Sequence, residues 1–227
     1  MKNEKILKCS LCLKNFNAII INNNLLKIKI RESDFHIIYN DYSPLLYEAI
    51  VCSNCGFAGL KEKFESITPF EEKILRNLFS KKKILPFPKI NNFLERNYED
   101  AEIAFNQAIS WAKVLKISSY KIAGLILRNA WLCREQKKER EEKIYLEQAV
   151  EYYEKAYSYE GVVSSSLGEP GAAYLAGEMY RRLGNNKKAN IWFNSAIKLH
   201  NIKKNPLINE LAKQQLNIIN SINKEND

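Results

Sequence analysis

Two short stretches, CSLC at residues 9–12 and VCSNCGF at residues 51–57, contain four of the five cysteines of this 227-residue chain. Each stretch places two residues between its cysteines, and a tight turn of that size directs both thiolates towards one metal ion. Two such turns supply the four ligands of a tetrahedral zinc site. The sequence therefore predicts one structural Zn²⁺ held by Cys9, Cys12, Cys52 and Cys55. Four sulfur ligands would leave no position for a catalytic water.

The cysteine pairs leave two other interpretations open. A redox-active C-x-x-C motif normally lies near a βαβ unit, and neither pair has clear signs of that setting. An iron–sulfur cluster is a further option for four cysteines. Gly56 favours a metal site, because the residue after such a pair often needs a positive φ that lets N–H groups face the sulfurs. The 39 residues between the pairs exceed the spacing of about 15–20 in small zinc modules, which predicts a β insert.

The remaining cysteine and the two histidines offer weaker signals. His36 lies in the insert and is a candidate additional ligand, although the expectation is a hydrogen-bonded role at the surface. His200 has no motif around it. Cys133, in AWLCREQ, is isolated on an expected helix and is predicted to be a small buried hydrophobic residue.

The N-terminal part of the chain has the pattern of short strands and turns. Residues 16–21, 25–30 and 45–51 are predicted as strands, with NNN at 22–24 as the turn between the first two. Residues 67–79 predict a helix, with Thr68 as N-cap and Pro69 in the first turn. Residues 80–92 contain Pro86 and Pro88 and are predicted to be a linker.

From about residue 97 the pattern is helical. A triplet recurs in which an aromatic residue follows an alanine by four positions and precedes another by three. Small residues at this spacing let two helices approach closely while the aromatic residue fills the groove between them. The triplets are Ala101, Phe105 and Ala108; Ala149, Tyr153 and Ala156; and Ala189, Phe193 and Ala196.

The third triplet continues backwards through the stretch AYLAGEMYRRLGNNKKANIWFNSA. Within it Ala176, Gly177, Tyr180 and Gly184 lie at the offsets of a tetratricopeptide repeat. The triplets are 48 and 40 residues apart rather than about 34, and the charged run at 134–143 and the loop at 161–170 account for the surplus. A final amphipathic helix from Asn205 and Pro206 is predicted to close the stack.

These patterns predict an α+β protein in which a small zinc-ribbon-like β domain precedes an all-α, tetratricopeptide-like repeat domain. The expected divisions are a zinc-binding domain at 1–66, a helix and proline-containing linker at 67–96, and the repeat domain with its capping helix at 97–227.

The net charge of +9 raises nucleic-acid binding as an alternative function. Residues 1–97 contain 16 Lys and Arg against 10 Asp and Glu, and Lys81, Lys82 and Lys83 are the candidate phosphate contacts. Phe35 and Tyr39 are candidates for stacking on bases. Against this, the sequence has no arginine-rich helix, and lysines that only solvate the surface explain the same composition.

Several function classes lack support in the sequence. No nucleotide-binding, metalloprotease or nucleophile-elbow motif is present, so no catalytic residue and no small-molecule substrate is assigned, and we lean against an enzyme. No apolar stretch reaches the roughly 18 residues of a membrane span, and no signal peptide is recognised. We therefore expect a cytoplasmic protein that does not bind membranes, in a compartment where thiols stay reduced.

The stretch LKCSLCLKNF and the later stretch RESDFHIIYNDYSPLLYEAIVCSNCGFAG resemble a bacterial family known as domain of unknown function 2225. The segments LILRNAWLCRE and YLAGEMYRRLG are also similar to its C-terminal half, so the resemblance covers nearly the whole chain. It implies a four-cysteine metal site followed by helical repeats, and no assigned reaction. Ser10 and Leu13 depart from the Pro and Gly common there. The shared features besides the cysteines are Arg31, Asp34, Tyr39, Pro44 and Tyr47.

The leading functional prediction is a non-enzymatic interaction or adaptor protein. The zinc would stabilise the β domain, and the repeats would present a groove to a protein or peptide partner. Arg128, Arg181 and Arg182 are candidate contacts to an acidic partner. Nucleic-acid binding is the first alternative, and a thiol redox sensor, which would lose zinc when mild peroxide oxidises its cysteines, is the second.

Overall fold

The computed structural model describes residues 2–81, 85–160, 168–203 and 206–225, and the statements below concern these residues. Contacts divide the chain into two compact units. The first, the cysteine unit, comprises Met1–Arg31, Ile37–Ile117 and Trp131–Lys137. The second, the helical unit, comprises Glu32–His36, Ser118–Ala130 and Lys138–Asp227. The expected domain boundaries at 66/67 and 96/97 stay predictions, because these units are defined by contacts rather than by independent folding.

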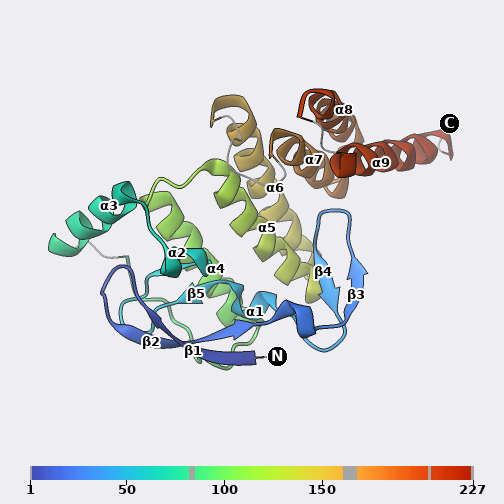
Figure 1. Cartoon of the computed structure of the whole chain (residues 1–227). Helices are drawn as coiled ribbons and strands as arrows, with labels where there is room; N and C mark the ends of the chain where they lie inside the picture. Colours follow the sequence, from blue (N-terminus) through green and yellow to red (C-terminus); the bar gives the residue numbers. More distant parts are fainter. Residues whose placement is uncertain (1, 82–84, 161–167, 204–205, 226–227) are drawn as a thin grey trace. The chain divides into compact units, whose positions relative to one another are not determined.

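The cysteine unit contains three antiparallel pairs of strands (Figure 1). Strand β1 (Lys2–Lys8) pairs with β2 (Asn15–Ile21), β3 (Ile28–Arg31) with β4 (Ile37–Tyr39), and β5 (Ile50–Val51) with β6 (Ala58–Gly59). The first and third pairs end opposite each other at Lys8 and Asn15 and at Val51 and Ala58. Each of these hairpins is therefore closed by one C-x-x-C turn.

Two of the strand predictions need correction. Residues 45–51 were expected to form one strand, but Leu45–Glu48 is a helical turn, α1, and only Ile50–Val51 is extended. Pro44 lies at φ −61° and ψ −23° and starts this turn in the helical region. The Asn22 side chain accepts from the N–H of Asn24 and begins a 3-10 turn, so β2 pairs with β1 and not with the strand that follows.

Aromatic side chains form the core of the cysteine unit around α4 (Tyr98–Val114), which packs on α1, β5 and β6. Phe57 and Trp111 are fully buried, with ring centroids 5.2 Å apart. Phe64, in the short helix α2 (Glu62–Glu65), lies 5.4 Å from both Phe57 and Phe16. These contacts join β2, the second cysteine turn, α2 and α4 into one core.

The helix expected at 67–79 is observed as α3 (Pro69–Ser80). The Thr68 hydroxyl accepts from the backbone N–H of Glu71, and the Glu71 side chain accepts from the N–H of Thr68. This reciprocal capping satisfies two backbone donors at the helix start. The prediction of Thr68 as N-cap is confirmed.

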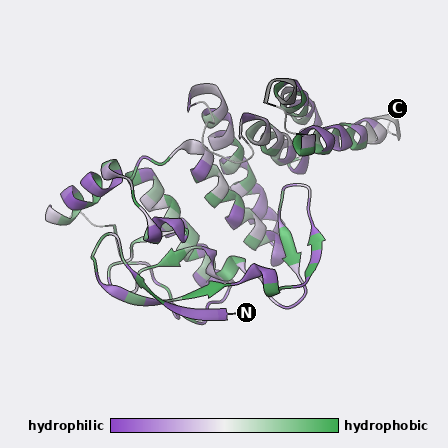
Figure 2. Cartoon of the chain, viewed as in Figure 1, coloured by the Kyte–Doolittle hydropathy of each residue, from purple (hydrophilic) through white to green (hydrophobic). Residues whose placement is uncertain are grey.

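The helical unit contains most of α5 (Ser119–Glu135), together with α6 (Glu139–Lys155), α7 (Gly168–Arg182), α8 (Asn186–Lys203) and α9 (Pro206–Glu225). A π-helical turn, Ala156–Glu160, continues α6. Helix α7 contacts α6, α8 and α9, and α8 also contacts α9 (Figure 1). These helices have both hydrophobic and hydrophilic residues along their length, as expected for a stack with a buried side (Figure 2).

All nine residues of the Ala–aromatic–Ala triplets are buried, with at most 2% of their surface exposed. In the third triplet Phe193 lies against Gly177 of α7, and a Cβ built on Gly177 would come within 2.7 Å of the Phe193 ring. Gly184 ends α7 at φ +78°, where the Asn185 N–H reaches the Tyr180 carbonyl at 2.8 Å. The glycines of this stretch therefore allow the close approach and the turn between α7 and α8.

We predict that Gly177→Ala destabilises the protein by about 1–3 kcal/mol, because the new methyl group must displace a fully buried ring. The matched control is Gly124→Ala, also within a helix, where the nearest atom to the added Cβ is the Arg128 Nη1 at an ordinary 3.5 Å. That control is expected to be neutral or to stabilise by up to about 1 kcal/mol. Urea unfolding measures both, and an equal effect of the two substitutions would contradict the packing argument.

Candidate metal centre

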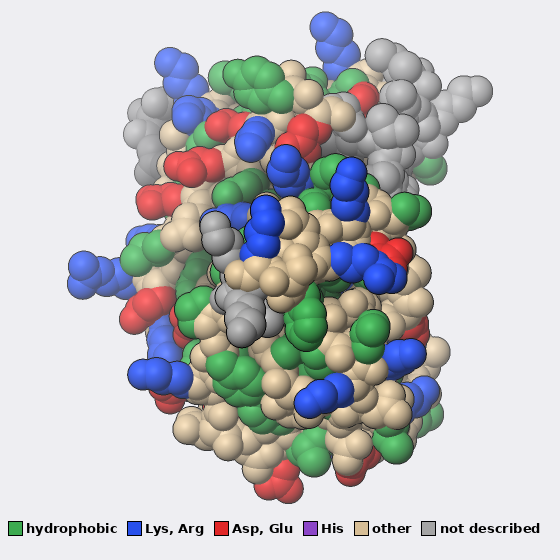
Figure 3. Space-filling view, turned by 90° about the vertical axis from the view of Figure 1, so that its left-hand side faces the viewer, with side chains coloured by type: hydrophobic (Ala, Val, Ile, Leu, Met, Phe, Trp, Pro, Cys, Tyr) green, Lys and Arg blue, Asp and Glu red, His purple; other side chains and the backbone are tan. Residues whose placement is uncertain are grey.

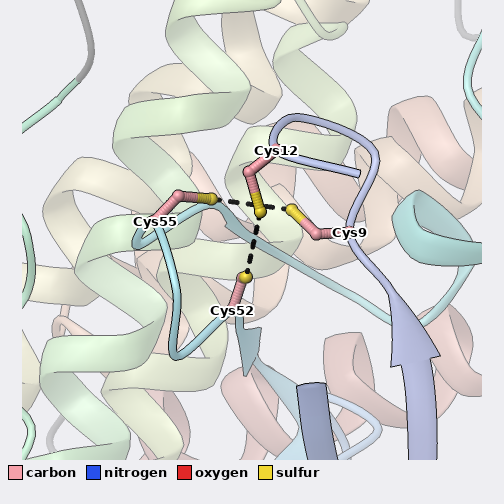
Figure 4. Close-up of side chains that lie close together, drawn as sticks. All are labelled: Cys9, Cys12, Cys52 and Cys55. Carbon is pink, nitrogen blue, oxygen red and sulfur yellow. Dashed lines mark hydrogen bonds between the residues drawn. The ribbon is translucent and has the colours of Figure 1, made fainter. Parts of the chain in front are cut away.

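The two C-x-x-C turns bring four sulfur atoms together (Figure 4). The Sγ atoms of Cys9 and Cys55 are 3.6 Å apart, and those of Cys12 and Cys52 are 3.8 Å apart. All four Sγ atoms lie within 4.8 Å of one another. These separations are far longer than the disulfide bond of about 2.05 Å, and all four cysteines are free thiols.

The spacing fits a tetrahedral thiolate site. A zinc–sulfur distance of about 2.3 Å places the corners of a regular tetrahedron about 3.8 Å apart. The pairs Cys9–Cys55 and Cys12–Cys52 are at 3.6 and 3.8 Å and all four sulfurs lie within 4.8 Å, so the ligands need only small movements to reach this geometry. The four cysteines can therefore hold one metal ion with all of its positions filled by sulfur.

The two turns share one pattern of backbone hydrogen bonds. In the first, the Cys9 N–H donates to the Lys14 carbonyl and the Leu13 N–H donates to the Cys9 carbonyl, each at 3.0 Å. In the second, Cys52 donates to Phe57 at 2.8 Å and Gly56 donates to Cys52 at 2.9 Å. The equivalent residues Leu13 and Gly56 both have a positive φ, at 62° and 73°. The positive φ predicted at Gly56 is confirmed, and Leu13 adopts the same conformation despite its side chain.

Helix α4 fixes the second turn through the carbonyl of Gly56. The Trp111 Nε1 and the Gln107 Nε2 each donate to this oxygen at 3.0 Å. A Cβ on Gly56 would lie 2.8 Å from the Pro88 Cδ, so the close packing also excludes a side chain here. Trp111 and Gln107 could not be predicted at this site, because they lie more than 50 positions further along the chain than Gly56.

Two further contacts hold the turns in place. The Asn54 side chain, between the cysteines of the second turn, donates to the Asn15 carbonyl at the start of β2 at 3.1 Å. The Ser10 hydroxyl donates to the Lys63 carbonyl in α2 at 2.9 Å. Asn54 thereby joins the two cysteine turns, and Ser10 joins the first turn to the neighbouring helix.

Hydrogen bonds among the sulfurs shape their ionisation. Hydrogen bonds from Cys55 and Cys9 lower the pKa of Cys52 to about 2, and the hydrogen bond to Cys52 raises the pKa of Cys9 to about 12. The same partner, Cys52, also raises the pKa of Cys55 above its usual range. These hydrogen bonds favour the thiolate at Cys52 and the thiol at Cys9 and Cys55, and a divalent cation would favour the thiolate form of its ligands.

The structure also locates the other residues singled out from the sequence. His36 groups with the helical unit and is 1% exposed, so its expected surface position is wrong; its Nδ1 lies 2.7 Å from the Glu32 carboxylate. Cys133 is 1% exposed, as predicted.

The three arginines predicted as partner contacts bond within the helical unit. Arg128 donates to the Gly124 carbonyl at 2.9 Å, and Arg181 and Arg182 form ion pairs with acidic residues of the helical unit.

The candidate nucleic-acid contacts lie partly outside the described residues. Lys81 is exposed, whereas Lys82 and Lys83 lie outside the described residues, as do the 161–167 part of the predicted repeat loop and the His200 side chain. Phe35 packs on Tyr174 with ring centroids 5.4 Å apart. On the face drawn in Figure 3, the described Lys and Arg side chains are scattered among other side chains rather than gathered in one patch.

We predict that Leu13→Gly stabilises the protein by up to about 1 kcal/mol, because glycine adopts φ 62° without the strain that a Cβ imposes. The Leu13 side chain is 65% exposed, so little packing is lost. The control Leu13→Ala retains a Cβ and is expected to bring no such gain. Urea unfolding at a fixed free-zinc concentration compares them, and a gain from both or from neither would refute the strain argument.

Comparison with known proteins identifies one family. The model of the family described as "Uncharacterized protein conserved in bacteria (DUF2225)" matches residues 2–219. Neither the curated proteins nor the solved structures include a match. Within the described residues, none of the helices combines the length and apolar character that crossing a bilayer requires. The family match spans both cysteine turns and nearly all of the helices, and the chain therefore belongs to the DUF2225 family.

Proposed function

We propose that this protein is a zinc-binding interaction module without enzymatic activity, in which Cys9, Cys12, Cys52 and Cys55 hold one structural Zn²⁺. The observation that carries the proposal is the set of four sulfur atoms within 4.8 Å of one another, at tetrahedral separations. Four thiolates select zinc over harder cations such as Mg²⁺ and Ca²⁺. With all four positions filled, the ion serves folding rather than catalysis.

The position of the cysteines supports a structural role. Cys9 and Cys52 are fully buried, and each lies at the end of a short hairpin. Strands of two residues such as β5 and β6 have little stability of their own. A zinc ion would join the two hairpins with an apparent binding free energy of about 10–16 kcal/mol, which the unfolded chain does not have available.

The helical unit is the part that we propose contacts a partner, as a tetratricopeptide-like stack. We propose as the contact region the half-buried ring pair Tyr157 and Trp192 with the exposed Tyr159 and Ile191, which lie close to them in the sequence, and call these four residues the apolar patch. Tyr159 is 84% exposed and Ile191 is 59% exposed. The rings of Tyr157 and Trp192, 5.0 Å apart, bring the end of α6 next to α8. Exposed apolar side chains such as Tyr159 and Ile191 favour contact with an apolar side of a protein or peptide partner.

A reducing compartment, the cytoplasm, suits this proposal. Four closely spaced thiols bind zinc only while they stay reduced, and an oxidising compartment would convert them to disulfides. The burial of Cys9 and Cys52 protects two of the four from reagents in solution.

The zinc part is tested by metal analysis of protein purified without oxygen. We expect one zinc per chain in the wild type and loss of zinc in Cys52→Ser, with a fall in stability of several kcal/mol. The matched control is Cys133→Ser, which changes the one cysteine outside the cluster and should keep its zinc. Acidification should release the ion, since protons compete for the thiolates. Wild-type protein that contains no zinc would rule out the metal role.

The interaction part is tested by placing a photo-crosslinking amino acid at Tyr159 of the full chain in the cells that naturally produce it. We expect a discrete adduct with a partner protein that disappears when Trp192→Ala is added. The control position is Phe79, which is 50% exposed on α3 of the cysteine unit and should give no such adduct. Equal adducts from both positions, or none from Tyr159, would argue against the patch as a binding surface.

A further inference from the structure

A short acidic turn, Glu32–His36, lies between β3 and β4 and groups with the helical unit. The Phe35 N–H donates to the Glu32 carbonyl at 3.1 Å, and the Glu32 N–H donates to the His36 carbonyl at 2.8 Å. These two bonds close a tight loop. Its tip presents one hydroxyl, Ser33, and two carboxylates, Glu32 and Asp34, together with the ring of Phe35.

Helix α7 contacts Ser33 through three side chains. The Tyr174 hydroxyl donates to the Ser33 backbone carbonyl at 2.7 Å. The Ser33 hydroxyl donates to the Glu178 Oε2 at 2.6 Å and accepts from the Arg181 Nη2 at 3.3 Å. Each donor in these contacts meets an acceptor, and α7 contacts the backbone of the turn as well as the Ser33 side chain.

The same helix places a cation beside both carboxylates of the turn, and Glu32 also pairs with His36 within the turn at 2.7 Å. The Arg182 Nε lies 3.2 Å from the Asp34 Oδ2, and its Nη2 lies 3.6 Å from the Glu32 Oε1. Asp34 and Glu178 are fully buried, so both depend on neighbouring cations. Arg181 supplies the cation for Glu178, at 3.0 Å. We call Tyr174, Glu178, Arg181 and Arg182 the α7 cradle.

Backbone strain and desolvation lower the stability of the bound turn. Phe35 has φ +71°, a conformation that costs a bulky residue about 1–2 kcal/mol. Buried ion pairs add little net stability, because desolvation of the charges offsets their attraction. The ring of Phe35 lies 5.4 Å from Tyr174 and supplies an apolar contact. The contacts therefore make the cradle specific for the turn, while backbone strain and desolvation offset part of the free energy that they provide. Backbone strain of this kind is typical of ligand clamps and switch segments.

We propose that the α7 cradle is a binding site for an acidic turn of a partner protein, and that the chain's own Glu32–Phe35 turn fills this site in place of the partner. This inference deepens the proposed interaction function and rests on it. The partner would present a carboxylate to Arg182, a hydroxyl and carbonyl to the three remaining cradle residues, and an apolar residue to the Tyr174 ring. Release of the chain's own turn would precede binding, which lowers the apparent affinity of the intact protein.

The experiment uses the full chain and a fluorescent cyclic peptide with the sequence of Arg31–Ile37, closed through its backbone. In Asp34→Lys the turn meets Arg182 with a like charge and should leave the cradle, while the cradle itself is unchanged. We expect this variant to bind the peptide at least tenfold more tightly than the wild type does. Adding Arg182→Ala should remove that gain. Far-ultraviolet circular dichroism and zinc content confirm that each variant is folded.

Two controls isolate the cradle. Asp41→Lys makes the same charge change at an exposed acid outside the turn and should bind the peptide as the wild type does. A peptide with lysine in place of its aspartate should not bind Asp34→Lys. If Asp34→Lys does not fold, Asp34→Asn replaces it, with a gain of at least threefold over the wild type as the criterion.

The inference would be overturned if Asp34→Lys and the wild type bound the cyclic peptide with equal affinity. It would also be overturned if the tighter binding of Asp34→Lys persisted after Arg182→Ala was added. Either result leaves the crosslinking at Tyr159 unaffected, because that residue lies outside the cradle. Failure of this inference and failure of the general interaction role are therefore told apart.

Discussion

The cysteine unit depends on four sulfur atoms that repel one another once ionised. They lie within 4.8 Å, and a cation between them would turn this repulsion into attraction. Several residues of the unit fix the positions of the two cysteine turns. Asn54 joins the two turns, and α4 holds the Gly56 carbonyl through Trp111 and Gln107. Of the two hairpins that carry the cysteines, β1 and β2 pair over seven residues, whereas β5 and β6 pair over only two. The second cysteine turn therefore relies on the aromatic core and on the hydrogen bonds from α4 for its position.

The helical unit is built on a different principle, the fit between small and aromatic residues. Gly177 lets α7 and α8 approach until the Phe193 ring fills the space where a side chain would be. Phe193 also lies 5.6 Å from Tyr174, whose hydroxyl reaches the acidic turn. The packing of the stack and the position of the α7 cradle are therefore linked through a single pair of rings.

Local signals in the sequence predict local structure well in this chain. The cysteine turns, the capping of α3 at Thr68 and the positive φ of Gly56 each depend on a few neighbouring residues, and each is observed. The prediction for 45–51 is wrong because Pro44 starts a helical turn in a stretch whose apolar residues suit either structure. Trp111 as a support of the metal centre and His36 as a buried residue could not be predicted, because distant segments create their surroundings.

The distance along the chain between the acidic turn and its cradle has a consequence for synthesis. Ser33 and Glu178 are 145 residues apart, and a ribosome needs about 7–30 s to add that many residues. During this interval the cysteine turns have emerged, whereas α7 does not yet exist. The carboxylates of Glu32 and Asp34 spend that time in water, and the cradle is filled only after most of the protein has been made. The order of translation thus gives the emerging chain a period in which its acidic turn is open to other proteins.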